Sequence, residues 1–356
     1  MPSSLPDPAP APAPASASAS ALGQDPKTVF VTSATGLVGS TLCELLIAQG
    51  YSVRATTRDL STPAAQALLR VGVHLVQGSW DAPDSVLREN LGRSSKLFLC
   101  LLMDLFDASL MPQRAAQMAR VARAAGVTQV VTLTSLGSAM VEDGAPLLPV
   151  PLSPFAAAAF PAGYDVEKAA MAGGFDSWTL LRPGFFMANF LEPKIGLGFV
   201  GQLRDREKGV WRSSMAGEAL LGLVDHVDIA KTAVAAFEAP AKFHGKKVGL
   251  VSDEMPVQNA LDGLARAIGD GRKLKAEFMG DDEMKAAQEA GSWLYFCSDP
   301  TARYMHDYVG DLAEIGSWIP GGLTSWDAFL AREEKLVRET YGRRMKRRSF
   351  WLFGWK

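Results

Sequence analysis

Short apolar runs alternate with stretches of helical periodicity between residues 28 and 182 of this chain. The apolar runs are rich in Val, Leu and Thr, which is typical of buried strands, and most are followed by a turn or polar residue. The segments between the runs place apolar residues three and four positions apart, as amphipathic helices do. Strands that alternate with helices in this way form a parallel sheet, so the pattern predicts an α/β fold with a doubly wound parallel sheet.

The pattern also sets the expected bounds of these elements. We expect strands at Thr28–Thr32, Ser52–Thr57, His74–Gln77, Lys96–Leu102, Gln129–Thr134 and Trp178–Arg182. We expect helices at Gly39–Gln49, Thr62–Val71, Asp84–Asn90, Pro112–Ala125 and Asp165–Ala172. Because doubly wound sheets bind ligands at the C-terminal ends of their strands, functional residues are expected at that edge.

The first strand runs into a glycine turn. The chain reads Ser33-Ala34-Thr35-Gly36-Leu37-Val38-Gly39 between this strand and the following helix. A strand, a glycine turn and a helix in this order bring backbone N–H groups and the positive end of the helix close to a pyrophosphate. Gly36 and Gly39 suit such an approach, whereas Ser33 stands where a glycine usually makes the tight turn. The segment predicts a dinucleotide-binding site.

Residues at the ends of the second and third strands bear on the choice of dinucleotide. Thr57 stands where an acidic residue would select NAD, and Arg58 beside it can pair with the 2′-phosphate of NADP. This favours NADP, with NAD as the alternative, unless Arg58 is only a surface residue paired with Asp59. After the third strand, Ser79 or Asp81 can hydrogen-bond the adenine amino group, although an ordinary loop explains these residues almost as well.

A tyrosine and a lysine four residues apart follow the serine at the end of the fifth strand. Tyr164 and Lys168 share one face of the expected helix, and Ser135 comes directly after the strand. An ammonium group lowers the pKa of a nearby phenol, which then passes a proton to a carbonyl oxygen that a serine hydroxyl steadies. We therefore expect Tyr164, Lys168 and Ser135 to be catalytic. The alternative for Tyr164 is a half-buried aromatic residue near Pro161.

Composition narrows the class of protein. A chain of 356 residues with 48% hydrophobic residues can bury a large core, and its net charge of −2 gives no support for a nucleic-acid partner. The three cysteines, Cys43, Cys100 and Cys297, are far apart and odd in number, which predicts free thiols and a cytoplasmic location. Four scattered histidines and no paired cysteines predict that no metal is bound.

The two ends of the chain differ from the rest. Residues 1–26 are mainly Pro, Ala and Ser and offer too little apolar surface to fold, so we expect a disordered arm. The C-terminal end joins the basic residues 343–348 to the aromatic residues Phe350, Trp351, Phe353 and Trp355. Two interpretations stay open: a solvated or docked tail, and a tail that contacts an anionic membrane surface.

In this order the segments resemble the NmrA-like family of atypical short-chain dehydrogenases, which are Rossmann proteins that bind NAD(P). The resemblance runs from Thr28 to about Arg332, and its motifs are the glycine turn, Val53–Asp59, Ala124–Val127, Lys168, Leu181–Phe190 and Val224–Ala230. It implies an NAD(P)-binding domain over residues 27–332, with a smaller substrate lobe formed mainly by 185–225 and 250–332. A C-terminal helix and the basic-aromatic tail would follow over residues 333–356.

The resemblance also implies where ligands lie. The cofactor would lie across Ser33–Val38, Arg58 and Lys168, and the substrate pocket would include Phe185–Asn189. Further cofactor contacts are expected at Ser79, Leu102, Phe186 and Asn189. We expect the rest of the pocket to come from Gly184–Trp211 and Ala287–Ser317, where aromatic residues such as Trp293 and Phe296 suggest an apolar or aromatic ligand.

Two functions of different classes follow. The first is an NADP-dependent reductase that transfers hydride to a small carbonyl, quinone or conjugated double bond, with Tyr164 as the proton donor. The second is a sensor that binds NADP(H) without turnover and changes its contacts with a protein partner. A sugar-nucleotide epimerase would need a polar pocket, for which the sequence shows no signature.

Overall fold

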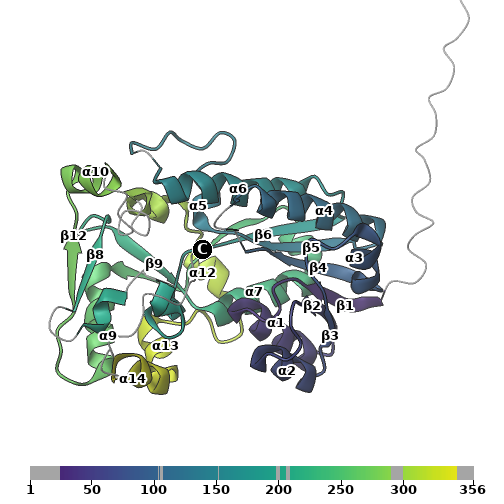
Figure 1. Ribbon diagram of the computed structural model, residues 1–356, viewed down its shortest axis with the longest axis horizontal. Coiled ribbons are helices and arrows are strands. Elements are labelled where there is room, and N and C mark those ends of the chain that lie inside the picture. The colour runs from purple at the N-terminus through teal and green to yellow at the C-terminus, as the bar shows by residue number, and fades with distance from the viewer. Residues whose placement is uncertain are drawn as a thin grey trace, which may run out of the picture.

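Seven parallel strands form the centre of the molecule (Figure 1). The computed structural model describes residues 25–102, 104, 107–150, 152–197, 201–205, 209–289 and 300–342. The strands are β1 (Asp25–Val31), β2 (Ser52–Thr57), β3 (His74–Gln77), β4 (Ser94–Cys100), β5 (Gln129–Leu133), β6 (Ser177–Pro183) and β10 (Lys247–Leu250). Their order in the sheet is β10-β6-β5-β4-β1-β2-β3, and every neighbouring pair is parallel. This confirms the predicted doubly wound α/β fold, whose strand order reverses between β1 and β4.

Helices cover both faces of the sheet (Figure 1). One face carries α1 (Leu37–Ala48), α2 (Pro63–Arg70) and α7 (His226–Glu238), and the other carries α3 (Asp84–Leu91), α4 (Leu110–Ala124), α5 (Leu136–Ala139) and α6 (Pro154–Met171). The two-residue period of a strand divides the core between these faces. Val29 and Val31 pack with α1 and α7, whereas Phe30 packs with α4 and α6.

A smaller lobe lies beyond the C-terminal edge of the sheet, on the left of Figure 1. Its strands are β7 (Phe185–Phe186), β9 (Leu220–Val224) and β11 (Asp253–Pro256) in one sheet, and β8 (Val210–Ser213) and β12 (Lys275–Phe278) in another. Its helical segments are α9 (Val257–Ile268), α10 (Asp281–Glu289), α13 (Trp326–Arg332), α14 (Glu334–Gly342), η1 (Met187–Phe190), η2 (Lys194–Leu197), η3 (Gly201–Arg204) and η4 (Pro300–Tyr308). Its core gathers Phe190, Trp326 and Tyr341. Two short helices, α8 (Pro240–Phe243) and α12 (Leu312–Gly316), pack near the edge strand β10.

The predicted elements are all present, but one begins far from its expected position. Strands β2 and β3 have the predicted bounds, and β1, β4, β5 and β6 shift by a few residues. Helix α6 begins at Pro154 rather than Asp165, so that prediction was wrong. Pro161 reads as a helix breaker, yet the first turns are held by Ser153, whose hydroxyl accepts a hydrogen bond from the Ala156 amide at 3.1 Å.

Some predictions concern residues outside the described part of the chain. Residues 1–24, the basic-aromatic tail at 343–356, Cys297, Trp293 and Phe296 all lie there. None of the helices that the structure describes is long and apolar enough to span a bilayer.

A buried ion pair fastens helix α6 to strand β6. Arg182 donates from Nε and Nη2 to the two carboxylate oxygens of Glu167, at 3.0 and 2.6 Å. The Glu167 side chain is fully buried and that of Arg182 is 5% exposed. Thr134, at the end of β5, donates a further hydrogen bond of 2.6 Å to Glu167, and Arg182 also reaches Glu142 at 2.6 Å. Both carboxylate oxygens of Glu167 and the Nε and Nη2 groups of Arg182 thereby have hydrogen-bond partners.

Removing one partner of this pair will cost much stability, because the other charge is then buried without compensation. Glu167→Gln is expected to lower the free energy of unfolding by about 3 kcal/mol. The matched control on the same helix is Asp165→Asn, which breaks the solvent-exposed pair with Lys168 and is expected to cost less than about 1 kcal/mol. Urea unfolding followed by circular dichroism measures both; equal losses would contradict this account.

Candidate functional site

The glycine turn after β1 leaves the start of helix α1 open. Gly36 is the N-cap residue, no side chain caps the helix, and its first turn carries no acidic residue. The N–H groups of this first turn and the positive end of the helix dipole are therefore free to bind an anion. A Cβ at Gly39 would lie 2.3 Å from the Ser33 carbonyl oxygen, so the close packing of turn and helix requires glycine there.

Ser33 adopts a backbone conformation that glycine usually supplies. Its φ is +51°, in the left-handed region, as expected for the position where other dinucleotide turns have glycine. Its hydroxyl donates a hydrogen bond of 2.7 Å to the carbonyl oxygen of Cys100, at the end of β4. Thr32 accepts a bond of 2.7 Å from the Cys100 amide. Ser33 and Thr32 thus tie the ends of β1 and β4 together at the switch point of the sheet.

The Cys100 thiol at this junction favours its protonated form. Burial raises its pKa to about 11, although a hydrogen bond from Ser33 opposes the shift. The same cause raises the pKa of Cys43, on α1, to about 12. Both residues are free thiols, as the sequence predicts.

Arg58 extends from the end of β2 without a partner. The residue is exposed, and within the described residues its guanidinium forms neither an ion pair nor a hydrogen bond. The alternative pairing with Asp59 is not formed, because Asp59 accepts hydrogen bonds from the backbone and the hydroxyl of Ser61, both at 2.7 Å. A cationic side chain is thus available beside the glycine turn.

The residues expected beside adenine are already engaged with each other. Ser79 donates to Asp81 at 3.3 Å, and Asp81 forms a two-pronged ion pair with Arg114 of α4 at 2.6 and 2.9 Å. The pairing with Arg114 lowers the pKa of Asp81. Leu102, after β4, is 65% exposed. Asn189 is partly exposed and forms no hydrogen bond with the described residues, and Phe186 packs partly against the sheet core.

The structure does not join the three residues expected to be catalytic. The Tyr164 hydroxyl donates to Asp143 at 3.1 Å, and Lys168 pairs with Asp165 at 2.7 Å. The Lys168 ammonium lies over the Tyr164 ring, 4.9 Å from its centroid, and its pKa is raised by the hydrogen bond to Asp165. Ser135 lies at the end of β5, and no hydrogen bond links it to Tyr164 or Lys168. Their catalytic roles stay predictions.

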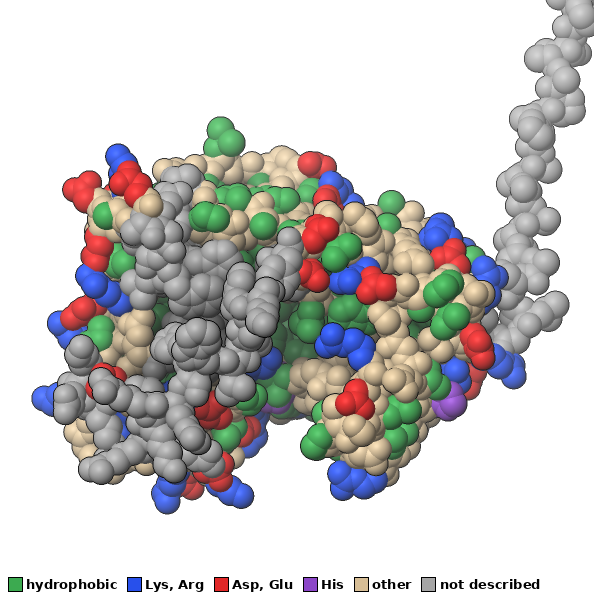
Figure 2. Space-filling view, in the orientation of Figure 1, with side chains coloured by type: hydrophobic (Ala, Val, Ile, Leu, Met, Phe, Trp, Pro, Cys, Tyr) green, Lys and Arg blue, Asp and Glu red, His purple; other side chains and the backbone are tan. Residues whose placement is uncertain are grey.

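An apolar cavity of about 170 Å³ lies between the C-terminal edge of the sheet and the lobe. The sheet side supplies residues that follow β5 and β6, and the lobe supplies β8, β9 and η4. The lining residues are Leu136, Phe155, Phe160, Gly184, Phe185, Trp211, Ser213, Ser214, Met215, Leu220, Leu221, Gly222, Ala302, Met305, His306 and Val309. Figure 2 shows hydrophobic side chains in the hollow between the two parts on this face.

The cavity both supports and corrects the expected pocket. Gly184, Phe185 and Trp211 lie in the first expected range, and Ala302 to Val309 in the second. Residues 213–222 supply six of the lining residues and were not expected in the pocket. The sequence pattern does not show that the tertiary fold brings β8 and β9 to the cavity wall. Phe190 does not line the cavity: its side chain is fully buried in the lobe core. His306 lies in the second expected range but was not singled out, since a lone histidine carries no sequence signal for a site.

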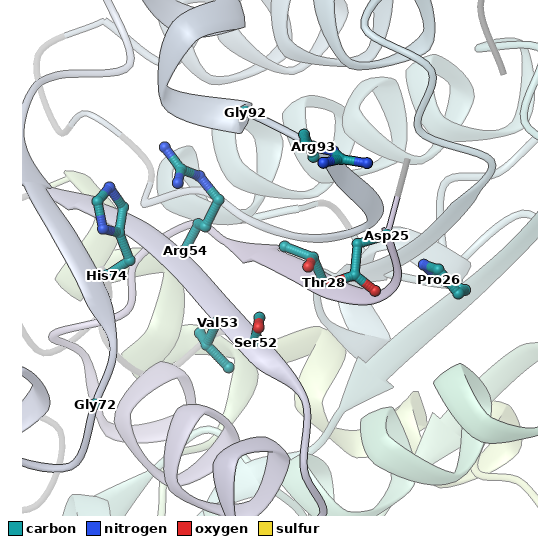
Figure 3. Close-up of a pocket in the computed structure, with 10 residues that line it drawn as sticks. All are labelled: Asp25, Pro26, Thr28, Ser52, Val53, Arg54, Gly72, His74, Gly92 and Arg93. Carbon is teal, nitrogen blue, oxygen red and sulfur yellow. The ribbon is translucent and has the colours of Figure 1, made fainter. Parts of the chain in front are cut away.

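A larger depression, of about 640 Å³, lies at the opposite edge of the sheet (Figure 3). It is lined by the starts of β1, β2 and β3, and Figure 3 shows Arg54 reaching toward Gly92. The Arg54 guanidinium donates hydrogen bonds to the carbonyl oxygens of Asn90 and Glu89, at 3.0 and 3.4 Å. Open α/β sheets bind ligands at the other edge, so this depression is not part of the candidate site. Within the described residues, no cluster of His, Cys, Asp and Glu side chains is arranged to hold a metal ion.

The Ser33 geometry predicts different effects for two substitutions. Ser33→Ala loses the hydrogen bond to Cys100 but keeps the positive φ, and is expected to cost about 1 kcal/mol of unfolding free energy. Ser33→Gly loses the same bond but relieves the backbone strain, worth about 1 kcal/mol, so its stability should stay close to that of the parent. Urea unfolding of the two variants tests this; a larger loss for Ser33→Gly would show that the turn is unstrained.

Known proteins resemble this chain in fold and, more distantly, in sequence. An NAD(P)H azoreductase from Xenophilus azovorans is 29% identical over 215 residues, which span 60% of this chain and 64% of the azoreductase, less than two thirds of its length. The NADPH-dependent quinone oxidoreductase QOR2 from Escherichia coli, solved with NADPH, has a TM-score of 0.63 at 19% identity, covering 85% of this chain and 99% of that chain. NmrA, a negative transcriptional regulator solved with NADP, has a TM-score of 0.60 at 16% identity, covering 89% and 95%.

The two solved structures support the fold, and the family follows from the sequence itself. The model of the NmrA-like family matches residues 25–287, which include the glycine turn, the whole central sheet and most of the lobe strands and helices described above. This chain belongs to the NmrA-like family.

Proposed function

We propose that this protein is an NADP(H)-dependent reductase of small apolar or aromatic substrates that carry a carbonyl, quinone or conjugated double bond. One observation carries the proposal: the apolar cavity adjoins the ends of β5 and β6, on the same edge of the sheet as the open glycine turn after β1. A cofactor that starts at the turn and runs along this edge reaches the cavity with its other end.

The residues at this edge fit a dinucleotide. The free N–H groups at the uncapped start of α1 can bind the pyrophosphate. The close packing of Gly39 against Ser33 holds the start of the helix directly beside the turn. Asn189 offers an unpaired amide near the other end of the edge. When bound in the reduced form, the nicotinamide supplies a hydride, which carries the two electrons of the reduction.

Arg58 favours NADP over NAD. Its free guanidinium can form charge-assisted hydrogen bonds with a 2′-phosphate, whereas Thr57 offers no carboxylate to the ribose hydroxyls of NAD. QOR2 was solved with NADPH, which supports the same choice, whereas NmrA was solved both with NADP and with NAD.

The size and chemistry of the cavity support a small ring-shaped substrate. Its volume of about 170 Å³ is below the range of about 300–1,000 Å³ that is usual for drug-sized ligands. Phe155, Phe160, Phe185 and Trp211 give it aromatic walls, which suit a flat apolar ligand. The relatives named for azo and quinone reduction are consistent with such a substrate.

A sensor that binds NADP(H) without turnover is the second candidate. A tyrosine-dependent reductase would require hydrogen bonds that link Tyr164, Lys168 and Ser135. The observation in favour of the sensor is that these three residues are not linked in this way. The likeness to NmrA, a transcriptional regulator, fits this candidate. NADPH oxidation by the purified protein, measured with a panel of quinones, azo dyes and aromatic carbonyls, separates the two: NADPH binding without oxidation of any compound would favour the sensor.

The proposed role of Arg58 predicts selective loss of NADPH binding. Arg58→Ala should raise the Kd for NADPH about tenfold to a hundredfold, the equivalent of about 1.5–3 kcal/mol for charge-assisted hydrogen bonds, and leave the Kd for NADH unchanged. Fluorescence titration with both nucleotides measures this. Arg70→Ala, at the far end of α2, is the control and should change neither constant. If the two variants bind NADPH with the same Kd, Arg58 does not contact the cofactor.

A further inference from the structure

A histidine and a glutamate form a hydrogen-bonded pair at the wall of the apolar cavity. His306 of η4 lines the cavity, and its Nδ1 lies 2.8 Å from Oε1 of Glu254 on β11. Glu254 stands opposite Gly222 in the β11–β9 pairing, and Gly222 lines the cavity as well. The Glu254 side chain is 14% exposed and that of His306 is 49% exposed. The pair therefore lies between the cavity and solvent, where protons can be exchanged.

We propose that His306 is the proton donor of the reduction, acting from Nε2, and that Glu254 is the residue that positions its ring. The inference rests on the proposed reductase function and deepens it. Because Nδ1 faces the carboxylate, Nε2 is the nitrogen left for the substrate. The pairing with the carboxylate also fixes the ring orientation, as in other His–carboxylate pairs.

His306 is the one titratable side chain among the described residues that line the cavity. Tyr164 is not among these lining residues, and its hydroxyl is already donated to Asp143. The other polar groups of the lining are Ser213 and Ser214. The Ser214 hydroxyl is buried and has no hydrogen-bond partner among the described residues, so an otherwise apolar wall holds one unpaired polar group. A substrate oxygen would satisfy it.

The fold holds His306 in a fixed place. Met305 and Tyr308, its neighbours on η4, pack against Met140 and Phe160 of the sheet domain. After η4, the amide of Gly310 donates to the carbonyl oxygen of Gly249 on β10 at 2.8 Å. Before His306, Arg303 donates from Nε to the Ser214 carbonyl oxygen at 2.6 Å. These contacts tie η4 to both the sheet domain and the lobe, which suits a residue that must be placed accurately.

The charges around His306 favour its protonated form. The hydrogen bond to Glu254 raises the pKa of His306, and Asp307, its neighbour on η4, adds a smaller effect in the same direction, while partial burial opposes them. A raised pKa means that the imidazolium persists to a higher pH and is lost as the pH rises through that value. A proton donor with this property loses its activity as the pH rises.

The step balances with one hydride and one proton. The Nε2–H bond of His306 breaks and an O–H bond forms at the substrate oxygen, while the reduced dinucleotide supplies the hydride and its two electrons. The substrate is reduced to the alcohol or quinol, the dinucleotide is oxidised, and neutral His306 regains its proton from solvent.

His306→Gln in the full-length protein tests the inference, with a naphthoquinone as substrate. We expect kcat to fall about a hundredfold or more, with the Kd values for NADPH and naphthoquinone unchanged in fluorescence titrations. The parent is expected to lose kcat at alkaline pH, and this loss should be absent in His306→Gln. Glu254→Gln should shift that loss to lower pH and, in the NMR titration of the free protein, lower the pKa of His306. His244→Gln, on the surface beside Trp178, is the matched control and should leave all of these unchanged.

Two results would overturn the inference, and each is distinguishable from failure of the reductase proposal. If the parent reduces the naphthoquinone and His306→Gln does so equally well with the same pH profile, while Tyr164→Phe is inactive, then Tyr164 is the donor and the reductase proposal stands. If Glu254→Gln leaves the His306 titration unchanged, Glu254 does not position it. If none of the compounds in the panel supports NADPH oxidation by the parent, the reductase proposal fails, and the proposed role of His306 as proton donor fails with it.

Discussion

The buried pair of Glu167 and Arg182 sets the spacing on which the candidate site depends. It joins the middle of α6 to the end of β6, and both elements lead directly into the cavity wall, through Phe155 and Phe160 on one side and Gly184 on the other. Two charges without solvent must keep near-ideal hydrogen-bond geometry or lose the attraction that offsets their desolvation. Helix and strand are therefore held in one register. Glu142 extends the pair toward β10, since it accepts from both Arg182 and Lys247, at 2.6 and 2.9 Å.

Contiguous features of the chain could be predicted from sequence, and features assembled from distant segments could not. The strands and the glycine turn each depend on a few neighbouring residues, whose periodicity and backbone requirements are local. The cavity draws on residues from 136 to 309, so no stretch of sequence carries its pattern. His306 and Glu254 are 52 positions apart and meet only because η4 packs beside β9 and β11.

Tyr164 and Lys168 illustrate a subtler limit. The four-residue spacing correctly predicts that they share a face of α6, and the ammonium does lie over the ring. Spacing cannot say where that face points. The helix was expected to begin at Asp165, whereas α6 begins at Pro154, so Tyr164 lies well inside the helix rather than just before it. Phe155 and Phe160, from the turns that the sequence interpretation missed, are the α6 residues that line the cavity.

The cavity is built into the fold and does not need closure of two domains. Segment 324–332 of the lobe is anchored to α7 under the sheet: Arg332 donates to both oxygens of buried Asp225, at 2.5 and 3.1 Å, and Thr324 donates to Asp228 from its amide at 2.7 Å. Burial alone would raise the pKa of Asp225, but bonds from His226 and Arg332 outweigh it and lower the pKa, so this anchor persists until the pH is strongly acidic. The lobe is thus fixed to the sheet domain here and through η4, and these contacts hold the two walls of the cavity together. In the proposed reductase, specificity comes from which rings fit the existing space, and His306 is in place before the substrate arrives.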